Sequence, residues 1–258
     1  MDTKTNSSTP LLGQRLKKIA SPRVAIIGAM DQEIEQLKSA LVSRTHETIA
    51  GFDFYTGRLD GTEVVLLKSG IGKVNAAIGS AILLYHYEPT CVINTGSAGG
   101  FDAELEVGDV VISEEVRHHD VDLTVFGYEP GQVPGLPPAF TPDPLLVEIA
   151  EQCIGSMQGM KTVNGLIATG DAFMDNPDRV HAARALFPAM KACEMEAAAI
   201  AQTCHRFDVP FLVIRALSDI AGKESGVSFH QFLETAAKHS ADMVTAIVKR
   251  LSEKAASV

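Results

Sequence analysis

The sequence predicts an α/β fold built on a mostly parallel sheet that helices cover on both faces. Short apolar, β-branched segments such as Val24–Ile27 and Phe211–Leu217 alternate along the chain with segments of helical periodicity. Fully apolar strands of this kind are typical of sheets that are buried on both faces. A hairpin pattern, formed by 52–59 and 63–68 around the turn Asp60-Gly61, adds antiparallel pairing. We therefore expect a mixed sheet that is partly closed.

The elements can be assigned in order along the chain. Strands are predicted at 24–27, 52–59, 63–68, 91–94, 107–113, 116–123, 162–168 and 211–217, and helices at 31–42, after Gly70-Ile71-Gly72, at 143–157, from Pro177, at 195–206 and at 228–252. The helix after Gly72 is expected to bury Val74, Ala77, Ile78, Ala81, Ile82 and Tyr85. Residues 126–142 form a Pro- and Gly-rich loop with several apolar side chains.

A single domain is expected over residues 23–258, because no repeat, low-complexity tract or linker interrupts the pattern. Residues 1–22 carry Lys4, Arg15, Lys17 and Lys18 among polar residues. They lack the apolar core of about 7–15 residues that a secretion signal needs. We predict that they form a flexible N-terminal extension.

The composition excludes several classes of protein. With 22 Lys and Arg against 32 Asp and Glu, the net charge is −10, which argues against binding to nucleic acid or to anionic membranes. No apolar run reaches the ~18–20 residues that span a bilayer. Cys91, Cys153, Cys193 and Cys204 lie in apolar surroundings without CxxC spacing, which indicates buried, reduced thiols in a cytoplasmic protein.

Candidate site residues gather where the predicted strands end. In open α/β sheets, ligands bind beyond the carboxyl ends of the strands. Those ends fall at 30–33, 69–72, 96–100, 170–173 and 218–219, and all are rich in glycine, small polar residues or carboxylates. The coincidence of five such segments predicts one ligand site.

Acidic residues at these ends allow two interpretations each. Glu33 is either a partner of the helix dipole or a general base aimed into the crevice. Glu194 and Glu196 either begin a helix or accept hydrogen bonds from a sugar diol. Asp219 is either an N-cap or a partly desolvated acid that donates a proton near neutral pH. Arg215, on a buried strand, needs an anion, for which Glu33 and Glu196 are candidates.

Familiar motifs fail on inspection. Gly70-Ile-Gly-Lys-Val-Asn75 lacks the third glycine of GxGxxG and the Ser or Thr of a P-loop. Thr95-Gly-Ser97-Ala-Gly99 lacks the first glycine of a nucleophile elbow. His118, Asp120 and Asp122 could align on one strand face, but a solvated polar face needs no ion. We therefore predict no metal site.

Several stretches together resemble one known family. They are Ile27–Glu33, Lys68–Val74, Asn94–Gly100, Ser113–Tyr128, Thr169–Phe173, Glu194–Ala197 and Arg215–Asp219. In order and content they are similar to the bacterial 5′-methylthioadenosine/S-adenosylhomocysteine nucleosidases of the nucleoside phosphorylase superfamily. The resemblance extends from residue 24 to about residue 252.

The resemblance implies a three-layer α/β/α fold with a central mixed β-sheet, and a homodimer. It also implies hydrolysis of the adenine–ribose bond of 5′-methylthioadenosine and S-adenosylhomocysteine, with 5′-deoxyadenosine as a further substrate, without metal or cofactor. Such an enzyme serves methionine salvage and the recycling of S-adenosylmethionine by-products.

The same resemblance implies residue roles. Glu33 matches the base that activates water, Glu196 the carboxylate on the ribose hydroxyls and Asp219 the acid at adenine N7. The other implied substrate-binding residues are Met30, Ile71, Ser97, Ala98, Gly99, Phe173, Met174, Glu194, Met195, Arg215, Ser218 and Phe229. Leu123, Phe126, Tyr128 and Pro134 match a segment that reaches the neighbouring subunit's site.

Two alternatives remain at this point. A purine nucleoside phosphorylase would use phosphate in place of water, although Asp31 and Glu33 would repel it. A non-catalytic nucleoside-binding regulator would not need an acid, a base and a diol carboxylate together. A turnover assay with methylthioadenosine, with and without phosphate, separates the three.

Overall fold

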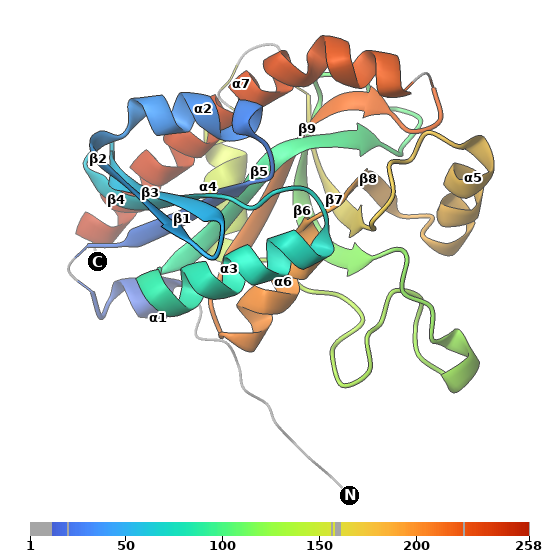
Figure 1. Ribbon diagram of the computed structural model, residues 1–258, viewed down its shortest axis with the longest axis horizontal. Helices are drawn as coiled ribbons and strands as arrows, with labels where there is room; N and C mark the ends of the chain where they lie inside the picture. The colour runs from blue at the N-terminus through green and yellow to red at the C-terminus, as the bar shows by residue number, and fades with distance from the viewer. Residues whose placement is uncertain (1–11, 20, 156, 158–160, 224, 258) are drawn as a thin grey trace, which may run out of the picture.

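A computed structural model describes residues 12–19, 21–155, 157, 161–223 and 225–257 (Figure 1). The strands are β1 (Arg23–Gly28), β2 (Val42–Ile49), β3 (Phe52–Leu59), β4 (Thr62–Lys68), β5 (Cys91–Gly100), β6 (Val110–His118), β7 (Thr162–Thr169), β8 (Met190–Glu194) and β9 (Phe211–Ile220). The helices are α1 (Leu12–Leu16), α2 (Asp31–Ala40), α3 (Lys73–Tyr87), α4 (Pro144–Ile154), α5 (Pro177–Leu186), α6 (Ala197–Arg206) and α7 (Ser225–Ala256), with a 3₁₀ turn at Thr124–Phe126.

The strands form a mixed sheet in the order β2-β3-β4-β1-β5-β8-β7-β6-β9. An additional pairing of β5 with β9 closes the strands from β5 onward into a ring. β1 pairs in parallel with β4 and β5, whereas β3 pairs antiparallel with β2 and β4. The predicted mixed, partly closed sheet is therefore confirmed.

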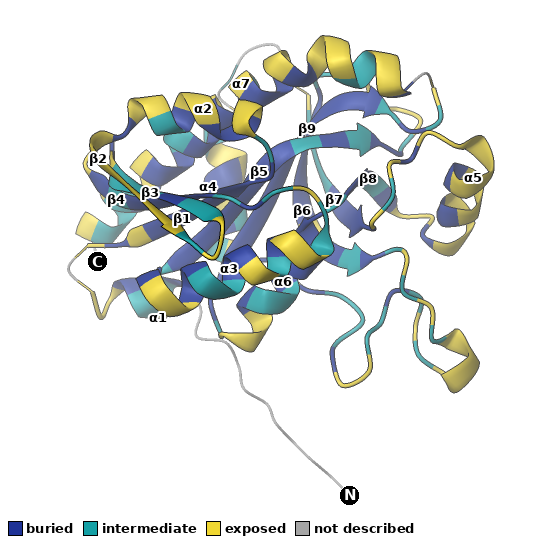
Figure 2. Cartoon of the chain, viewed as in Figure 1, coloured by how far each residue is buried: buried dark blue, intermediate teal, exposed yellow. Residues whose placement is uncertain are grey.

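Helices cover both faces of this sheet (Figure 1). Val24 and Ile26 of β1 pack into a core with α2, α4 and α7, whereas Ala25 and Ile27 pack into a second core with α3 and α6. β1, in the middle of the sheet, is accordingly buried from Val24 to Gly28 (Figure 2). Because both faces are covered, β1 is apolar at every position from Val24 to Ile27, as expected of a fully buried strand.

The structure corrects the predicted strands in three places. β2 was not predicted because its residues are almost all exposed and polar, so it lacks the pattern of a half-buried strand. β8 is also absent from the prediction, because a strand of only five residues is too short to give a clear pattern. The two strands predicted at 107–113 and 116–123 are one strand, β6, which carries an irregularity in its pairing between Ser113 and Glu115.

The predicted core face of α3 is confirmed only in part, because Ala77 and Ile82 pack partly buried against the core but the rest of the face does not. The helix buries Ala76, Leu83 and Leu84 together with small residues, whereas Val74 and Tyr85 are 68% and 81% exposed. The helix is apolar nearly all round, so periodicity could not decide which side faces the sheet. Its outward face is an unusual apolar surface for a monomer.

The predicted flexible extension is also corrected in part. Residues 12–16 form α1, in which Leu12 and Leu16 are buried in the core beside α4. The backbone N–H of Leu12 donates to Asp143 at 2.9 Å. The apolar pair Leu11-Leu12 in the sequence is an indication of buried structure here, but two apolar residues are too few to predict so short a helix. Residues 1–11 and 20 lie outside the described residues.

In the part of the chain that the structure describes, the helices are all too short or too polar to cross a bilayer.

Candidate active site

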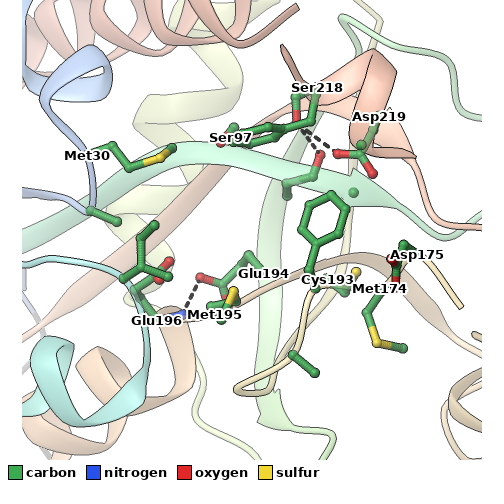
Figure 3. A pocket seen from close by; sticks show the side chains of 18 of the residues that line it. Met30, Ser97, Met174, Asp175, Cys193, Glu194, Met195, Glu196, Ser218 and Asp219 are labelled. Atoms are coloured by element: carbon green, nitrogen blue, oxygen red, sulfur yellow. Dashed lines mark hydrogen bonds between the residues drawn. The ribbon is translucent and has the colours of Figure 1, made fainter. Parts of the chain in front are cut away.

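A cavity of about 480 Å³ opens where β1, β5, β7, β8 and β9 end (Figure 3). Its wall includes fourteen of the predicted site residues: Met30, Glu33, Ile71, Ser97, Ala98, Gly99, Phe173, Met174, Glu194, Met195, Glu196, Ser218, Asp219 and Phe229. The predicted convergence of strand ends thus forms one site.

Glu33 is buried at the start of α2 and is held by four donors. Its Oε2 accepts the backbone N–H groups of Ala29 and Met30 at 2.8 and 3.1 Å. Its Oε1 accepts the backbone N–H and the hydroxyl of Ser97 at 2.9 and 3.0 Å. Glu33 therefore caps its helix, as the first interpretation expects, and also lines the cavity, while its role as a general base stays a prediction.

Gly96 makes room for this carboxylate. The residue has a φ of +153°, and a Cβ there would lie 2.6 Å from Glu33 Oε1. Any side chain at this position would displace Glu33. The close approach of the Glu33 carboxylate therefore explains why residue 96 is a glycine.

Glu196 lies across the cavity, just before α6. Its Oε1 accepts the Gly72 N–H at 2.9 Å, and the residue is 7% exposed. Burial, together with the neighbouring Glu194, raises the pKa of Glu196 to about 8, against the opposing effect of Arg215. The side chain is available to a ligand in the cavity.

Glu194, at the end of β8, is different because its oxygens are occupied by the protein. Oε1 accepts the Thr169 hydroxyl, and Oε2 accepts the N–H groups of Glu196 and Ala197 at 2.9 and 2.8 Å. Oε2 also receives Arg215 Nη2 at 2.6 Å. The helix-start interpretation is therefore right for Glu194, whereas Glu196 turns toward Gly72.

Arg215 does not line the cavity but lies buried behind it. Its partner is Glu194, and not Glu33 or Glu196 as expected, because Glu194 ends β8 and Arg215 lies on β9, two buried strands that both pair with β5. Its guanidinium also donates to Asn94 at 2.8 Å. Burial favours loss of the proton, but Glu194, Glu196 and Glu33 together raise the pKa of Arg215. The positive charge of Arg215 thus offsets part of the negative charge of these three glutamates, the acidic cluster.

Asp219 lies within β9, so it is not an N-cap. It is 3% exposed and accepts the hydroxyl of Ser218 at 2.9 Å. Burial raises the pKa of Asp219, while hydrogen bonds from Ser218 and Ser225 act in the opposite direction. The second interpretation, a desolvated acid, is the one that this geometry supports.

Aromatic and thioether side chains form the rest of the wall. The rings of Phe173 and Phe229 meet edge to face with centroids 5.8 Å apart. Met30 and Met195 line the same space, and Ile71 is half exposed at its edge. The cavity therefore combines apolar walls with carboxylates, as a nucleoside would require.

The loop predicted to reach a neighbouring subunit stays outside this cavity. Leu123 and Tyr128 are half-buried, Pro134 is exposed and Phe126 is 73% exposed. None of these four is among the described residues that line the cavity.

Sequence reasoning missed six lining residues: Ala29, Ala172, Asp175, Cys193, Gly226 and His230. All but Gly226 adjoin predicted residues along the chain, which was a usable signal; His230, for example, follows Phe229 on α7. Gly226, also on α7, has no predicted neighbour in the sequence. Burial raises the pKa of the Cys193 thiol, which makes this thiol a poor nucleophile.

The histidine-rich run around Asp120 has other partners. His118 pairs with Gln202 at 3.1 Å, Asp120 with Lys73 and Asp122 with Thr124. Across the described residues, no three His, Cys, Asp or Glu side chains are grouped so that they could hold a metal ion.

The comparisons with known proteins agree on one family. The family model described as the phosphorylase superfamily matches residues 23–249. The 5′-methylthioadenosine/S-adenosylhomocysteine nucleosidase of Geobacillus kaustophilus is 60% identical over 90% of this chain and 99% of its own length. The chain belongs to this nucleosidase family. The nucleosidase of Bacillus subtilis is 58% identical over 89% of this chain and 99% of its own.

Solved structures of nucleosidases share the fold. The nucleosidase of Colwellia psychrerythraea, described as a complex with adenine, has a TM-score of 0.88 and 52% identity, covering 90% of this chain and 96% of that one. The nucleosidase of Neisseria meningitidis, in complex with methylthio-immucillin-A, has a TM-score of 0.87 and 49% identity, covering 89% and 99%. The predicted family and fold class are confirmed.

Proposed function

We infer that the protein is an N-glycosyl hydrolase that cleaves 5′-methylthioadenosine and S-adenosylhomocysteine to adenine and the corresponding thioribose. The observation that carries the proposal is the make-up of the cavity. Glu33, Glu196 and Asp219 line it together, while neither Lys nor Arg is among its described lining residues. A phosphorylase would need a cationic group for phosphate, whereas a hydrolase needs an acid and a base.

Asp31 adds less to this argument than the sequence suggested. Its side chain is exposed and pairs with Lys68 at 3.0 Å, so it lies outside the described lining of the cavity. Glu33 alone supplies the negative charge at the end of β1. The preference for water over phosphate therefore rests on Glu33 and on the lack of a lining cation.

The proposed reaction follows from the charges that develop. Asp219 donates its proton to adenine N7 as the bond between C1′ and the base nitrogen breaks, so that the bonding electrons leave with the base. The ribose gains oxocarbenium character, and Glu196 holds its hydroxyls and favours that positive charge. Glu33 takes a proton from water as the water oxygen attacks C1′. Ser97 orients Glu33, and Arg215 balances the acidic cluster through Glu194.

The apolar part of the cavity accounts for the substrate class. Under this proposal Phe173 stacks on adenine and Met174 contacts it through its backbone, and both residues line the cavity. Ile71, Met195 and Phe229 form an apolar pocket for the 5′ alkylthio group, which they would favour over a free hydroxyl. 5′-Deoxyadenosine, which is apolar at the same carbon, is a further substrate under this proposal.

A homodimer is proposed from two exposed apolar surfaces. Val74, Ile78 and Tyr85 are exposed on α3, and Ile71 is exposed just before this helix. Val125 and Phe126 project from the 121–134 loop. Exposed apolar surfaces of this kind are typical of protein interfaces. We propose that the loop residues Leu123, Phe126, Tyr128 and Pro134 complete the 5′ pocket of the partner. The buried thiols of Cys91, Cys193 and Cys204 support a cytoplasmic location.

The test is product analysis in phosphate-free buffer. With methylthioadenosine as substrate, we expect adenine and free 5-methylthioribose, at a rate that added phosphate does not raise. Methylthioribose 1-phosphate as the obligatory product would identify a phosphorylase. Tight binding without turnover would identify a regulator.

A further inference from the structure

Hydrogen bonds among Lys73, Asp120 and Asp171 connect two segments that border the cavity, the one before α3 and the one after β7. Asp120, just after β6, accepts Lys73 Nζ through Oδ1 at 2.6 Å and the Asp171 N–H through Oδ2 at 3.0 Å. Asp171 in turn accepts the backbone N–H of Lys73 through its own Oδ1 at 2.8 Å. Lys73 follows the Ile71-Gly72 segment, and Asp171 precedes Phe173. The described lining of the cavity includes none of the three.

Asp171 caps α3 from outside that helix. The N-cap position of α3 is Gly72, which has no side chain to satisfy the free N–H groups of the first turn. Asp171 accepts one of these groups and places a negative charge at the positive end of the helix. The sequence around α3 contains no capping residue, so the cap depends on the neighbouring loop.

The backbone that this cap holds is the one that contacts Glu196. Gly72 has a φ of +97°, and a Cβ there would lie 3.2 Å from Asp171 Oδ1. The Gly72 N–H donates to Glu196 Oε1 at 2.9 Å. Contacts therefore run without a break from Asp120 through Asp171 and the start of α3 to Glu196.

We propose that Asp171 is a positioning residue for Glu196, and that Asp120 holds Asp171 in place. Because Glu196 acts on the ribose only under the function proposed above, this role rests on that function. The side chains of Lys73 and Asp120 are 20% and 30% exposed, and ion pairs so close to solvent contribute little to stability. The hydrogen bonds that Asp120 and Asp171 accept from backbone N–H groups instead set the position of the Gly72 N–H. A displacement of a positioned group by about 1 Å can lower the rate by up to about 10²-fold.

The test begins with Asp171→Ala, Asp171→Asn and Asp120→Ala. We expect Asp171→Ala to lower kcat/KM for methylthioadenosine by about tenfold or more and to raise KM, because the ribose contact is made in both ground and transition states. Asp171→Asn keeps an oxygen that can accept the Lys73 N–H, so it should recover most of the loss. Asp120→Ala should act in the same direction but less. Adenine, which has no ribose, should bind all three variants nearly as well as the wild type.

The matched control is Asp143→Ala. Asp143 is a buried acid that caps α4 by accepting the Leu145 N–H at 2.9 Å, away from the cavity. This variant should have a lower melting temperature but an unchanged kcat/KM. If it loses activity as Asp171→Ala does, the effect is a general cost of removing a cap, and the proposal is overturned.

The decisive arm combines Asp171→Ala with Glu196→Gln. If Asp171 acts through Glu196, the double variant should be no less active than Glu196→Gln alone. The positioning role alone would be overturned if the losses of kcat/KM in the two single variants multiply in the double variant. It would also be overturned if Asp171→Ala has a normal kcat/KM while Glu196→Gln is impaired. A normal Glu196→Gln would overturn the role of Glu196 itself and this inference with it. Should Asp171→Ala fail to fold, Asp120→Ala takes its place in the same cycle.

Discussion

Glu33 and Asp219 face the same cavity and are equally buried, each 3% exposed, but their surroundings differ. Glu33 accepts four hydrogen bonds, three of them from backbone N–H groups. Asp219 is bonded to the hydroxyl of Ser218, and burial raises its pKa. The difference shows that burial alone does not set the role of a carboxyl group. Under the proposed function, the carboxyl with four donors is the base, and the carboxyl whose pKa burial raises is the acid.

The largest effect is expected from Asp219→Asn. The amide keeps the shape of the side chain but cannot give a proton to N7, so kcat should fall by about 10²–10⁴-fold. The Ser218 hydroxyl can rotate to suit the amide, so the melting temperature should change little. Steady-state kinetics and a thermal melt on the same preparation check both parts. Near-normal turnover in the folded variant would remove Asp219 from the mechanism.

Glu33→Gln should lower kcat about as much as Asp219→Asn does, but it should differ from that variant in its stability. Substrate should still bind, because Glu33 addresses the water and not the nucleoside. The new NH₂ group must face donors from Ser97 or from the start of α2, which should lower the free energy of unfolding by about 1–3 kcal/mol. Equilibrium binding of methylthioadenosine and denaturant unfolding measure the two effects. A variant as stable as Asp219→Asn would contradict the contrast drawn between the two carboxyls.

Glu196→Gln should give a smaller loss of kcat and a raised KM, because Glu196 holds the ribose before and during the reaction. It should also change how stability depends on pH. The pKa of Glu196 is about 8 in the folded protein, above its ordinary value of 4.5, so the native state keeps a proton that the unfolded chain has released. Stability from this group is present below its ordinary pKa and is lost as pH rises toward 8.

The wild type should therefore lose more melting temperature than Glu196→Gln as the pH rises from about 5 to about 8. Melts in matched buffers across this range test the point without substrate. Parallel curves for the two proteins would show that Glu196 titrates as it does in the unfolded chain.

The smallest effect is expected from Phe126→Ala, at a residue far from both carboxyls in the sequence. Under the proposed dimer, its side chain reaches the partner's 5′ pocket. The variant should weaken binding of substrates with bulky 5′ groups more than binding of adenine. Sedimentation of the active wild-type protein is the companion measurement, and full activity in a monomer would contradict the shared site.

Much of the fold could be predicted from the sequence, because the buried strands and the hairpin carry strong local patterns. β1 and β9 were predictable since both faces of the sheet are covered. The outward face of α3 was not, because its apolar residues extend around the helix and only tertiary packing selects a side. β2 was not predictable either, because its exposed residues carry no apolar alternation.

The location of the site and most of its lining could be predicted, but the contacts of its individual acids could not. Glu194 and Glu196 are indistinguishable in the sequence, two positions apart. The structure separates them, because Thr169 and Arg215 occupy Glu194 while Glu196 meets Gly72. Such pairings depend on residues far away along the chain. The same distance explains why the partner of Arg215 was assigned wrongly.

Titration of the Asp219 carboxyl tests the contrast between the two acids most directly. Carbon-13 NMR of protein labelled at aspartate side chains, compared with Asp219→Asn, identifies the signal of this one group. Because burial raises its pKa, the Asp219 carboxyl should titrate above the ordinary aspartate value of about 3.9. A carboxyl that titrates at or below that value would be ionised whenever the enzyme works, and it would contradict the role of Asp219 as the acid.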